Sequence, residues 1–285
     1  MFEFWELAFM QRAFAAGIVV AVLCPTIGIY LVLRRLSMIG EMFAHISLAG
    51  VALGIFTGIY PLASALGLSL VAAAGLEALR RTYRIFGDLA IAIMISAGIG
   101  LAVVLISLSP NFDLFSYLFG SIIAISGKDL QLIASIGFFV LALIILLQKE
   151  LFFIAFDEEA ARAAGVRVEL VNTLFVVATA LTIAVAMRVV GILLVSSLIT
   201  VPVAAALQVG RSFRATVAYS YVFALAAVLS GLFVAYHADL APGGSIVLIS
   251  VLLFVAAALY NKVLGIGGRY VVNTRSAETP EGERL

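Results

Sequence analysis

The sequence predicts an all-α protein that crosses a membrane about eight or nine times. Of its 285 residues, 64% are hydrophobic and 12% are charged, and the mean hydropathy is +1.22. In soluble globular domains, roughly a quarter of all residues are charged. The apolar stretches are long enough for helices that cross a hydrocarbon core of about 30 Å. Most connections between them are short, which favours one compact helical bundle.

Nine apolar stretches follow one another along the chain. The predicted spans are residues 13–33, 39–58, 60–78, 89–109, 130–147, 168–187, 191–208, 215–236 and 245–262. The seventh opens at Gly191 and contains Pro202, so a broken or re-entrant segment is the alternative, which leaves eight spans. Residues 1–268 form the predicted membrane domain. Residues 269–285 are polar and rich in charge, and we expect a disordered cytoplasmic tail there.

The distribution of basic residues predicts the orientation. With the N-terminus outside, fourteen of the 17 Lys and Arg residues fall on the inner side, and only Arg12, Lys128 and Arg188 fall on the outer side. Basic residues accumulate on the cytoplasmic side of membrane proteins. We therefore expect the N-terminus outside and the C-terminus in the cytoplasm.

Several functional classes find no support in the composition. The net charge of +1 gives no indication of a nucleic-acid partner, and the single cysteine, Cys24, excludes an internal disulfide. The fragment GSIIAISGKD approaches a P-loop, but Ile122 stands where the first Gly belongs and Asp129 where Ser or Thr belongs. We therefore do not expect this chain to be an enzyme, and an ATP-driven activity would need a second chain.

Two of the connections are long enough to hold structure of their own. The outer segment 110–129 has an apolar middle, which predicts a short helix at the outer interface. The inner segment 149–167 contains EEAARAAG, an alanine-rich turn or two of helix with Asp157 as its N-cap and Gly165 as its stop. Such a helix suits a groove on a cytoplasmic partner, and an ordinary solvated surface helix is the alternative.

Glu41 and His45 are the most informative polar residues. Residues four apart lie on the same face of a helix. His45 lies ten residues beyond Arg35, which is about 15 Å along a helix and places it near mid-bilayer. An ionisable group at that depth must face the protein interior or a wet pathway. A carboxylate with an imidazole suits Zn²⁺ or Mn²⁺, and a hydrogen-bonded packing pair is the alternative.

The same stretch carries Gly50, Gly54 and Gly58 at four-residue spacing. Small residues at this spacing allow another helix to approach closely. We therefore expect one side of this helix to pack through its glycines and another to present Glu41 and His45.

The second histidine, His237, lies at the outer end of the eighth span, with Asp239 two residues further on. These two are candidate metal ligands for access or gating, and a solvated loop histidine is the alternative. An intramembrane hydrolase that uses Ser196 or Ser197 with His237 is a weaker hypothesis. No glycine motif of the kind that forms an oxyanion site surrounds these serines.

Three separated blocks carry a resemblance to a known family. They are PTIGIYLVLRRLSMIGEMFAHISLAGVALG, FDEEAARAAGVRVELVNTLFVVATALTIAVAMRVVGILLVSSLITVPVAAALQ and DLAPGGSIVL. Together they resemble the membrane permease subunit of ATP-binding-cassette (ABC) importers for zinc and manganese. The resemblance implies a homodimeric permease in the cytoplasmic membrane of a prokaryote, with two cytoplasmic ATPase subunits and an extracytoplasmic solute-binding protein. No nucleic acid and no permanently bound cofactor are implied.

The resemblance also implies roles for particular residues. The segment that docks on the ATPase in this family, with its N-cap, matches a run that we name the coupling segment: Asp157, Glu158, Glu159, Ala160, Ala161, Arg162, Ala163, Ala164 and Gly165. The family's Asp and His in the second span match Glu41 and His45, and Glu in place of Asp moves the carboxylate by one methylene.

The resemblance also implies which metal is transported, from the residues that follow His45. The wording HISLAG after the pair is more similar to the zinc-type members, so the expected cargo is Zn²⁺. Mn²⁺ or iron, both transported within the same family, are the alternatives. A proton-coupled secondary metal carrier, in which Glu41 relays protons, is the alternative from another class.

Overall fold

The computed structural model describes residues 8–82, 87–109, 113–121 and 125–264, and every regular element in these ranges is an α-helix. The helices are α2 (Ala8–Leu33), α3 (Met38–Thr57), α4 (Pro61–Thr82), α5 (Gly87–Ser107), α6 (Leu114–Phe119), α7 (Gly127–Phe156), α8 (Glu158–Ala163), α9 (Val168–Val190), α10 (Ile192–Val209), α11 (Phe213–Ala238) and α12 (Pro242–Leu264). Within the described ranges, nine of them are long and apolar enough to cross a membrane. The predicted polytopic helical bundle is confirmed.

The seventh predicted span is a complete helix. Pro202 lies inside α10, which runs without interruption from Ile192 to Val209, so the predicted span is confirmed and the alternative of a broken or re-entrant segment is wrong. A single residue, Gly191, separates α9 from α10 with a φ of 90°. Only glycine adopts this backbone region without a steric penalty, so two helices can be joined without a loop.

Helix α7 is longer than the predicted fifth span. It has 30 residues and continues through LFFIAF to Phe156, so residues 149–156 are helical and do not belong to a connection. Residues 151–156 are apolar, the whole stretch 149–156 includes no Gly or Pro, and the helix ends only where Asp157 caps the next one. The predicted tail 269–285 lies outside the described residues, and the orientation in the membrane stays a prediction.

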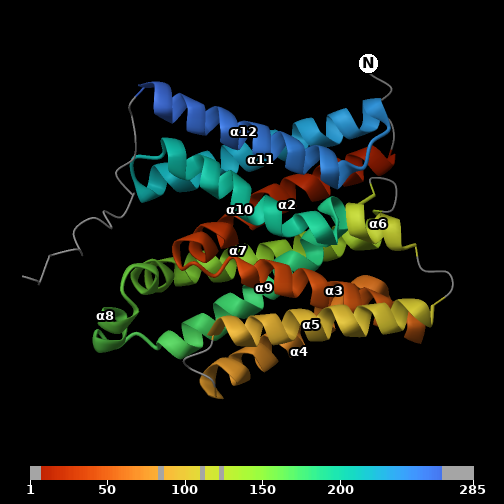
Figure 1. The fold of residues 1–285 in the computed structure, drawn as a ribbon, viewed down its shortest axis with the longest axis horizontal. Coiled ribbons are helices and arrows are strands. Elements are labelled where there is room, and N and C mark those ends of the chain that lie inside the picture. Colours follow the sequence, from red (N-terminus) through yellow and green to blue (C-terminus); the bar gives the residue numbers. More distant parts are fainter. Residues whose placement is uncertain (1–7, 83–86, 110–112, 122–124, 265–285) are drawn as a thin grey trace, which may run out of the picture.

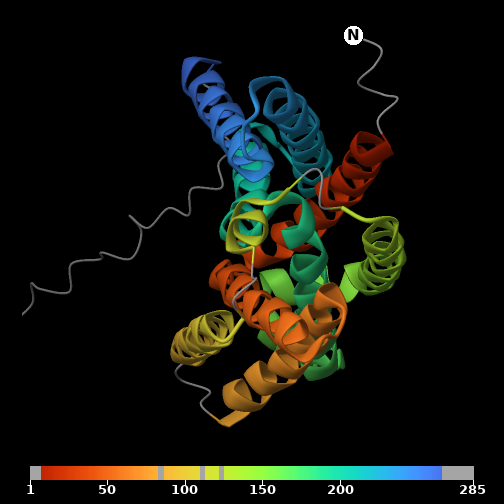
Figure 2. The same ribbon diagram turned by 90° about the vertical axis from the view of Figure 1, so that its right-hand side faces the viewer.

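The two short helices mark opposite ends of the bundle, which we name the α6 end and the α8 end (Figure 1). Viewed from the α6 end, α11 and α12 lie at one edge and α4 and α5 at the other (Figure 2). Between them α2, α3 and α9 are the most enclosed of the spanning helices, with 72% of an 18-residue apolar stretch of each buried. The other spans surround this inner layer and expose large apolar side chains, as lipid-facing helices do.

Three glycines bring the backbones of the α6 end into contact. Gly120 follows α6, Gly191 joins α9 to α10, and Gly243 lies in the first turn of α12. A Cβ on Gly191 would lie 2.6 Å from the amide nitrogen of Gly120, and one on Gly243 would overlap the carbonyl oxygen of Val190. The absence of side chains here is therefore what lets the three segments meet.

We predict that Gly243→Ala destabilises the protein by at least about 2 kcal/mol, because a backbone carbonyl cannot move aside as a flexible side chain can. The adjacent Gly244→Ala is the matched control, since nothing lies within 4 Å of a Cβ at that position. It is expected to be neutral or slightly stabilising because alanine favours a helix. The thermal unfolding midpoint of each purified variant is the measurement, and equal midpoints would contradict the prediction.

Candidate functional site

Glu41 and His45 lie together on α3. His45 Nε2 is 4.0 Å from Glu41 Oε1, and their side chains are 19% and 49% exposed. Both belong to a stripe that begins at Met38, which is also exposed, whereas most other residues of α3 are buried. One helix face therefore opens to the outside of this chain, and it carries both metal-ligand candidates.

The remaining faces of α3 are covered by α4, α5, α9 and α10. A Cβ on Gly50 would lie 2.5 Å from Cα of Ala65 in α4, and one on Gly54 would lie 2.9 Å from Cα of Pro61. On α5, a Cβ on Gly98 would lie 3.3 Å from the carbonyl carbon of His45. The predicted glycine packing is confirmed for Gly50 and Gly54, and it fixes the direction in which the pair points.

Gly58 does not belong to this packing surface. It is the C-cap of α3 with a φ of 75°, and no described atom lies within 4 Å of a Cβ placed there. Its role is to end the helix in the left-handed region, where glycine is favoured. The prediction that Gly58 packs against another helix is therefore wrong.

His237 and Asp239 lie at the end of α11. His237 is exposed, its Nδ1 is 3.0 Å from the carbonyl oxygen of Phe233, and its ring lies against the Phe233 ring. Asp239 is the C-cap of α11 and lines a cavity of about 470 Å³ at the α6 end. Nowhere in the described ranges do three His, Cys, Asp or Glu side chains form a possible metal site. The structure thus does not join these two residues to Glu41 and His45 in one site.

The coupling segment forms α8, and both of its ends are closed as the sequence predicts. Asp157 accepts a hydrogen bond from the amide of Ala160 at 2.8 Å. At the other end, the amides of Gly165 and Val166 donate to the carbonyl oxygens of Arg162 and Ala161, each at 3.1 Å. This is the Schellman arrangement, and Gly165 provides its left-handed residue with a φ of 87°.

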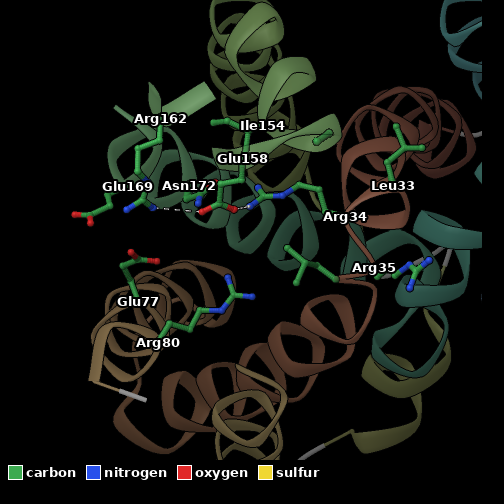
Figure 3. A pocket seen from close by; sticks show the side chains of 12 residues that line it. Leu33, Arg34, Arg35, Glu77, Arg80, Ile154, Glu158, Arg162, Glu169 and Asn172 are labelled. Atoms are coloured by element: carbon green, nitrogen blue, oxygen red, sulfur yellow. Dashed lines mark hydrogen bonds and ion pairs between the residues drawn. The ribbon is translucent and has the colours of Figure 1, made fainter. Parts of the chain in front are cut away.

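A cavity of about 580 Å³ lies beside α8 (Figure 3). Glu158 Oε2 is 3.8 Å from a guanidinium nitrogen of Arg34, and Glu158 Oε1 is 3.5 Å from Arg162. Glu77 and Arg80 reach into the same cavity from α4. Burial lowers the pKa of Arg34, and the charge of Glu158 opposes this shift. The Arg34 guanidinium is therefore a desolvated charge held beside a carboxylate.

A polar cluster at the α6 end was not predicted from the sequence, because its members are far apart along the chain. Asp129 is 1% exposed and accepts hydrogen bonds from Tyr60 at 2.6 Å, from Arg188 at 3.1 Å and from the amide of Ser126 at 2.9 Å. Arg188 also lies over the ring of Tyr117. Burial and the hydrogen bond to Asp129 raise the pKa of Tyr60, so the phenol stays protonated and donates. This cluster connects the turn before α4 with α6, α7 and α9.

Comparison with known proteins identifies the family. The sequence matches the ABC 3 transport family (ABC-3) over residues 6–261. The chain belongs to the ABC-3 family.

Several relatives of this ABC-3 chain are named as membrane proteins of metal transport systems. It is 37% identical over 259 residues to a probable metal transport system membrane protein of Treponema pallidum, and this alignment covers 90% of this chain and 97% of the relative. It is 31% identical over 245 residues to the high-affinity zinc uptake system membrane protein ZnuB of Haemophilus influenzae, which covers 85% and 94%. Further relatives are named for manganese or chelated iron, so the relatives do not resolve the metal.

Among solved structures, the chain resembles PsaBC from Streptococcus pneumoniae in complex with Fab. The TM-score is 0.80 at 30% identity, with 91% of this chain and 96% of that chain covered. The predicted resemblance is thus confirmed: this ABC-3 chain is a multi-pass membrane permease of the metal-importer family.

We predict that Asp129→Ala destabilises this ABC-3 chain by about 3 kcal/mol, because it removes the acceptor shared by Tyr60 and Arg188 in a buried site. Asp113→Ala is the matched control, since Asp113 is an exposed N-cap of α6 and is expected to cost only about 1 kcal/mol. Chemical or thermal unfolding of the purified protein measures both. A loss for Asp129→Ala no larger than that for Asp113→Ala would show that the cluster does not stabilise the fold.

Proposed function

We propose that this chain is the permease subunit of an importer that moves Zn²⁺ across the cytoplasmic membrane with ATP hydrolysed by a partner. The observation that carries the proposal is the Glu41–His45 pair, held on the open face of an otherwise buried helix. A polar pair near the middle of a bilayer, the depth predicted for His45, is costly in free energy unless it faces a polar pathway. Zn²⁺ accepts carboxylate oxygen and imidazole nitrogen as ligands.

The pathway lies between two copies of this chain. One copy offers two ligands on the open face of α3, and no third His, Cys, Asp or Glu joins them among the described residues. Two copies related by a two-fold axis would offer two carboxylates and two imidazoles, a number that matches the four ligands of zinc. His237 and Asp239 act as access ligands at the α6 end in this proposal.

Two further partners complete the importer. The ATPase subunits dock on α8, which is a small, firmly capped helix with exposed acidic residues in its first turn. An extracytoplasmic solute-binding protein delivers the metal at the opposite, α6 end. The orientation with α8 in the cytoplasm agrees with the basic residues of that end, among them Arg34, Arg80 and Arg162.

We predict that Glu41→Ala and His45→Ala each reduce zinc uptake more than about 100-fold, since even changes beyond the ligands cost about 10–100-fold in metal sites. Uptake of radioactive zinc by the reconstituted complex is the measurement, with size-exclusion chromatography to show that the subunits remain assembled. His237→Ala is the control variant and is expected to raise the zinc concentration for half-maximal uptake without abolishing transport.

Two outcomes would contradict this assignment. Normal uptake by both α3 variants would show that the pair does not line the pathway. Zinc uptake driven by a pH gradient into liposomes that contain this chain alone would instead support a proton-coupled carrier.

We predict that equimolar zinc suppresses manganese uptake by at least about tenfold, because nitrogen and oxygen sites bind Zn²⁺ more tightly than Mn²⁺. Competition between the two metals in the reconstituted complex is the measurement. The same assay on Glu41→Asp tests whether the carboxylate position sets the preference. Manganese uptake that persists in equimolar zinc would show that the metal is wrong while the permease function stands.

A further inference from the structure

The ion pair between Arg34 and Glu158 connects α8 with the turn that precedes α3. Glu158 opens α8, the helix on which the partner ATPase docks in the proposed function. Arg34 follows α2 and precedes α3 by four residues. Figure 3 shows the two side chains pointing toward each other across the cavity beside α8, while Arg35 points away. The contact between these segments is therefore made by long charged side chains.

The turn that carries Arg34 is closed by its own hydrogen bonds. The amide of Arg35 donates to the carbonyl oxygen of Val32 at 3.1 Å, and that of Leu36 donates to Leu31 at 2.8 Å. Arg35 has a φ of 57°, the left-handed region in which a Schellman turn holds its residue after the cap. A turn fixed in this way moves as one piece, and Glu41 lies in the first turn of the helix that follows it.

Helix α8 also packs against the rest of the bundle. Ala161 is fully buried, and the helix packs against α7 and α9, the two helices that it joins. Its two ion pairs among the described residues run from Glu158, one to Arg162 within α8 and one to Arg34 outside it. The second pair is thus the charged link from α8 to the turn before α3.

The surroundings favour this pairing for Arg34. Its side chain is 10% exposed, and its guanidinium also lies over the ring of Phe175. Arg80 repels it from α4, and Glu77 of α4 and Glu169 of α9 line the same cavity. A desolvated guanidinium that loses its carboxylate is strongly destabilised, so Arg34 is expected to follow Glu158 when α8 moves.

We propose that Arg34 is a positioning residue that transmits movement of α8 to the metal pair on α3. The inference rests on the proposed function, in which α8 receives the ATPase. When the ATPase shifts α8, Glu158 carries Arg34 with it and the closed turn displaces the first turn of α3. Glu41 then moves relative to the pair of the second copy, which changes how the two copies share the metal.

Arg34→Ala isolates this link. Without Arg34, Glu158 keeps Arg162 as a partner and its side chain is 46% exposed, so no buried charge is left unpaired. Arg34→Lys keeps a positive charge at the same place. The charge exchange Arg34→Glu with Glu158→Arg restores an ion pair with its sign reversed. Arg211→Ala is the matched control, since it removes an exposed arginine from the turn before α11.

The experiment measures zinc uptake and ATP hydrolysis together in the reconstituted complex with its ATPase and binding protein. In Arg34→Ala, zinc transported per ATP hydrolysed is expected to fall at least about fivefold, the lower end of typical coupling between sites. Basal ATP hydrolysis and assembly are expected to stay within about twofold of the wild type. Arg34→Lys and the charge exchange are expected to restore most of the ratio, and Arg211→Ala to leave it unchanged.

The possible results separate the two proposals. An unchanged ratio in Arg34→Ala, or a charge exchange that restores nothing, overturns the role of Arg34 and leaves the permease function intact. A wild-type complex that hydrolyses ATP but transports no zinc overturns the proposed function and the inference together. Loss of assembly in Arg34→Ala with no recovery in Arg34→Lys would show a structural role and also overturns the inference.

Discussion

The close approach of α4 and α5 to α3 is the constraint on which the rest of the structure depends. Gly50, Gly54 and Gly98 leave no room for side chains between these helices, so their backbones lie in direct contact. Because α3 is enclosed on these sides, the ionisable side chains of Glu41 and His45 lie on the remaining face, and the buried hydroxyl of Ser47 is paired with that of Ser69 on α4. The position of Glu41 and His45 thus follows from backbone packing as much as from the chemistry of the pair.

The two ends of the bundle are held by different kinds of contact. At the α6 end, Asp129 accepts hydrogen bonds from Tyr60, Ser126 and Arg188 in a buried cluster, and glycines bring the backbones together. At the α8 end, the contact between α8 and the turn before α3 crosses a cavity through Arg34 and Glu158. Buried networks resist rearrangement, whereas a partly exposed ion pair beside a cavity can move with its partners. This difference agrees with the proposal that the ATPase docks on α8.

The sequence predicted what depends on neighbouring residues. Hydropathy located the nine spans of the described ranges, and the capping residues Asp157 and Gly165 marked the two ends of α8. Two points were left open or misjudged because local rules allow more than one outcome. Pro202 permits a continuous helix as well as a break, so the sequence left both open, and α7 continued beyond the predicted span because a helix and an apolar stretch need not end together.

The sequence by itself determined the membrane class, the spans, the caps of α8 and the shared face of Glu41 and His45, because hydropathy, capping and helical periodicity act over a few residues. Only the tertiary structure decided that Asp129 meets Arg188, that Glu158 meets Arg34, and that the pair faces away from the bundle. Every span is similarly apolar, so composition does not say which helices pack together. That choice depends on the fit of their surfaces, above all on where glycines let two backbones meet.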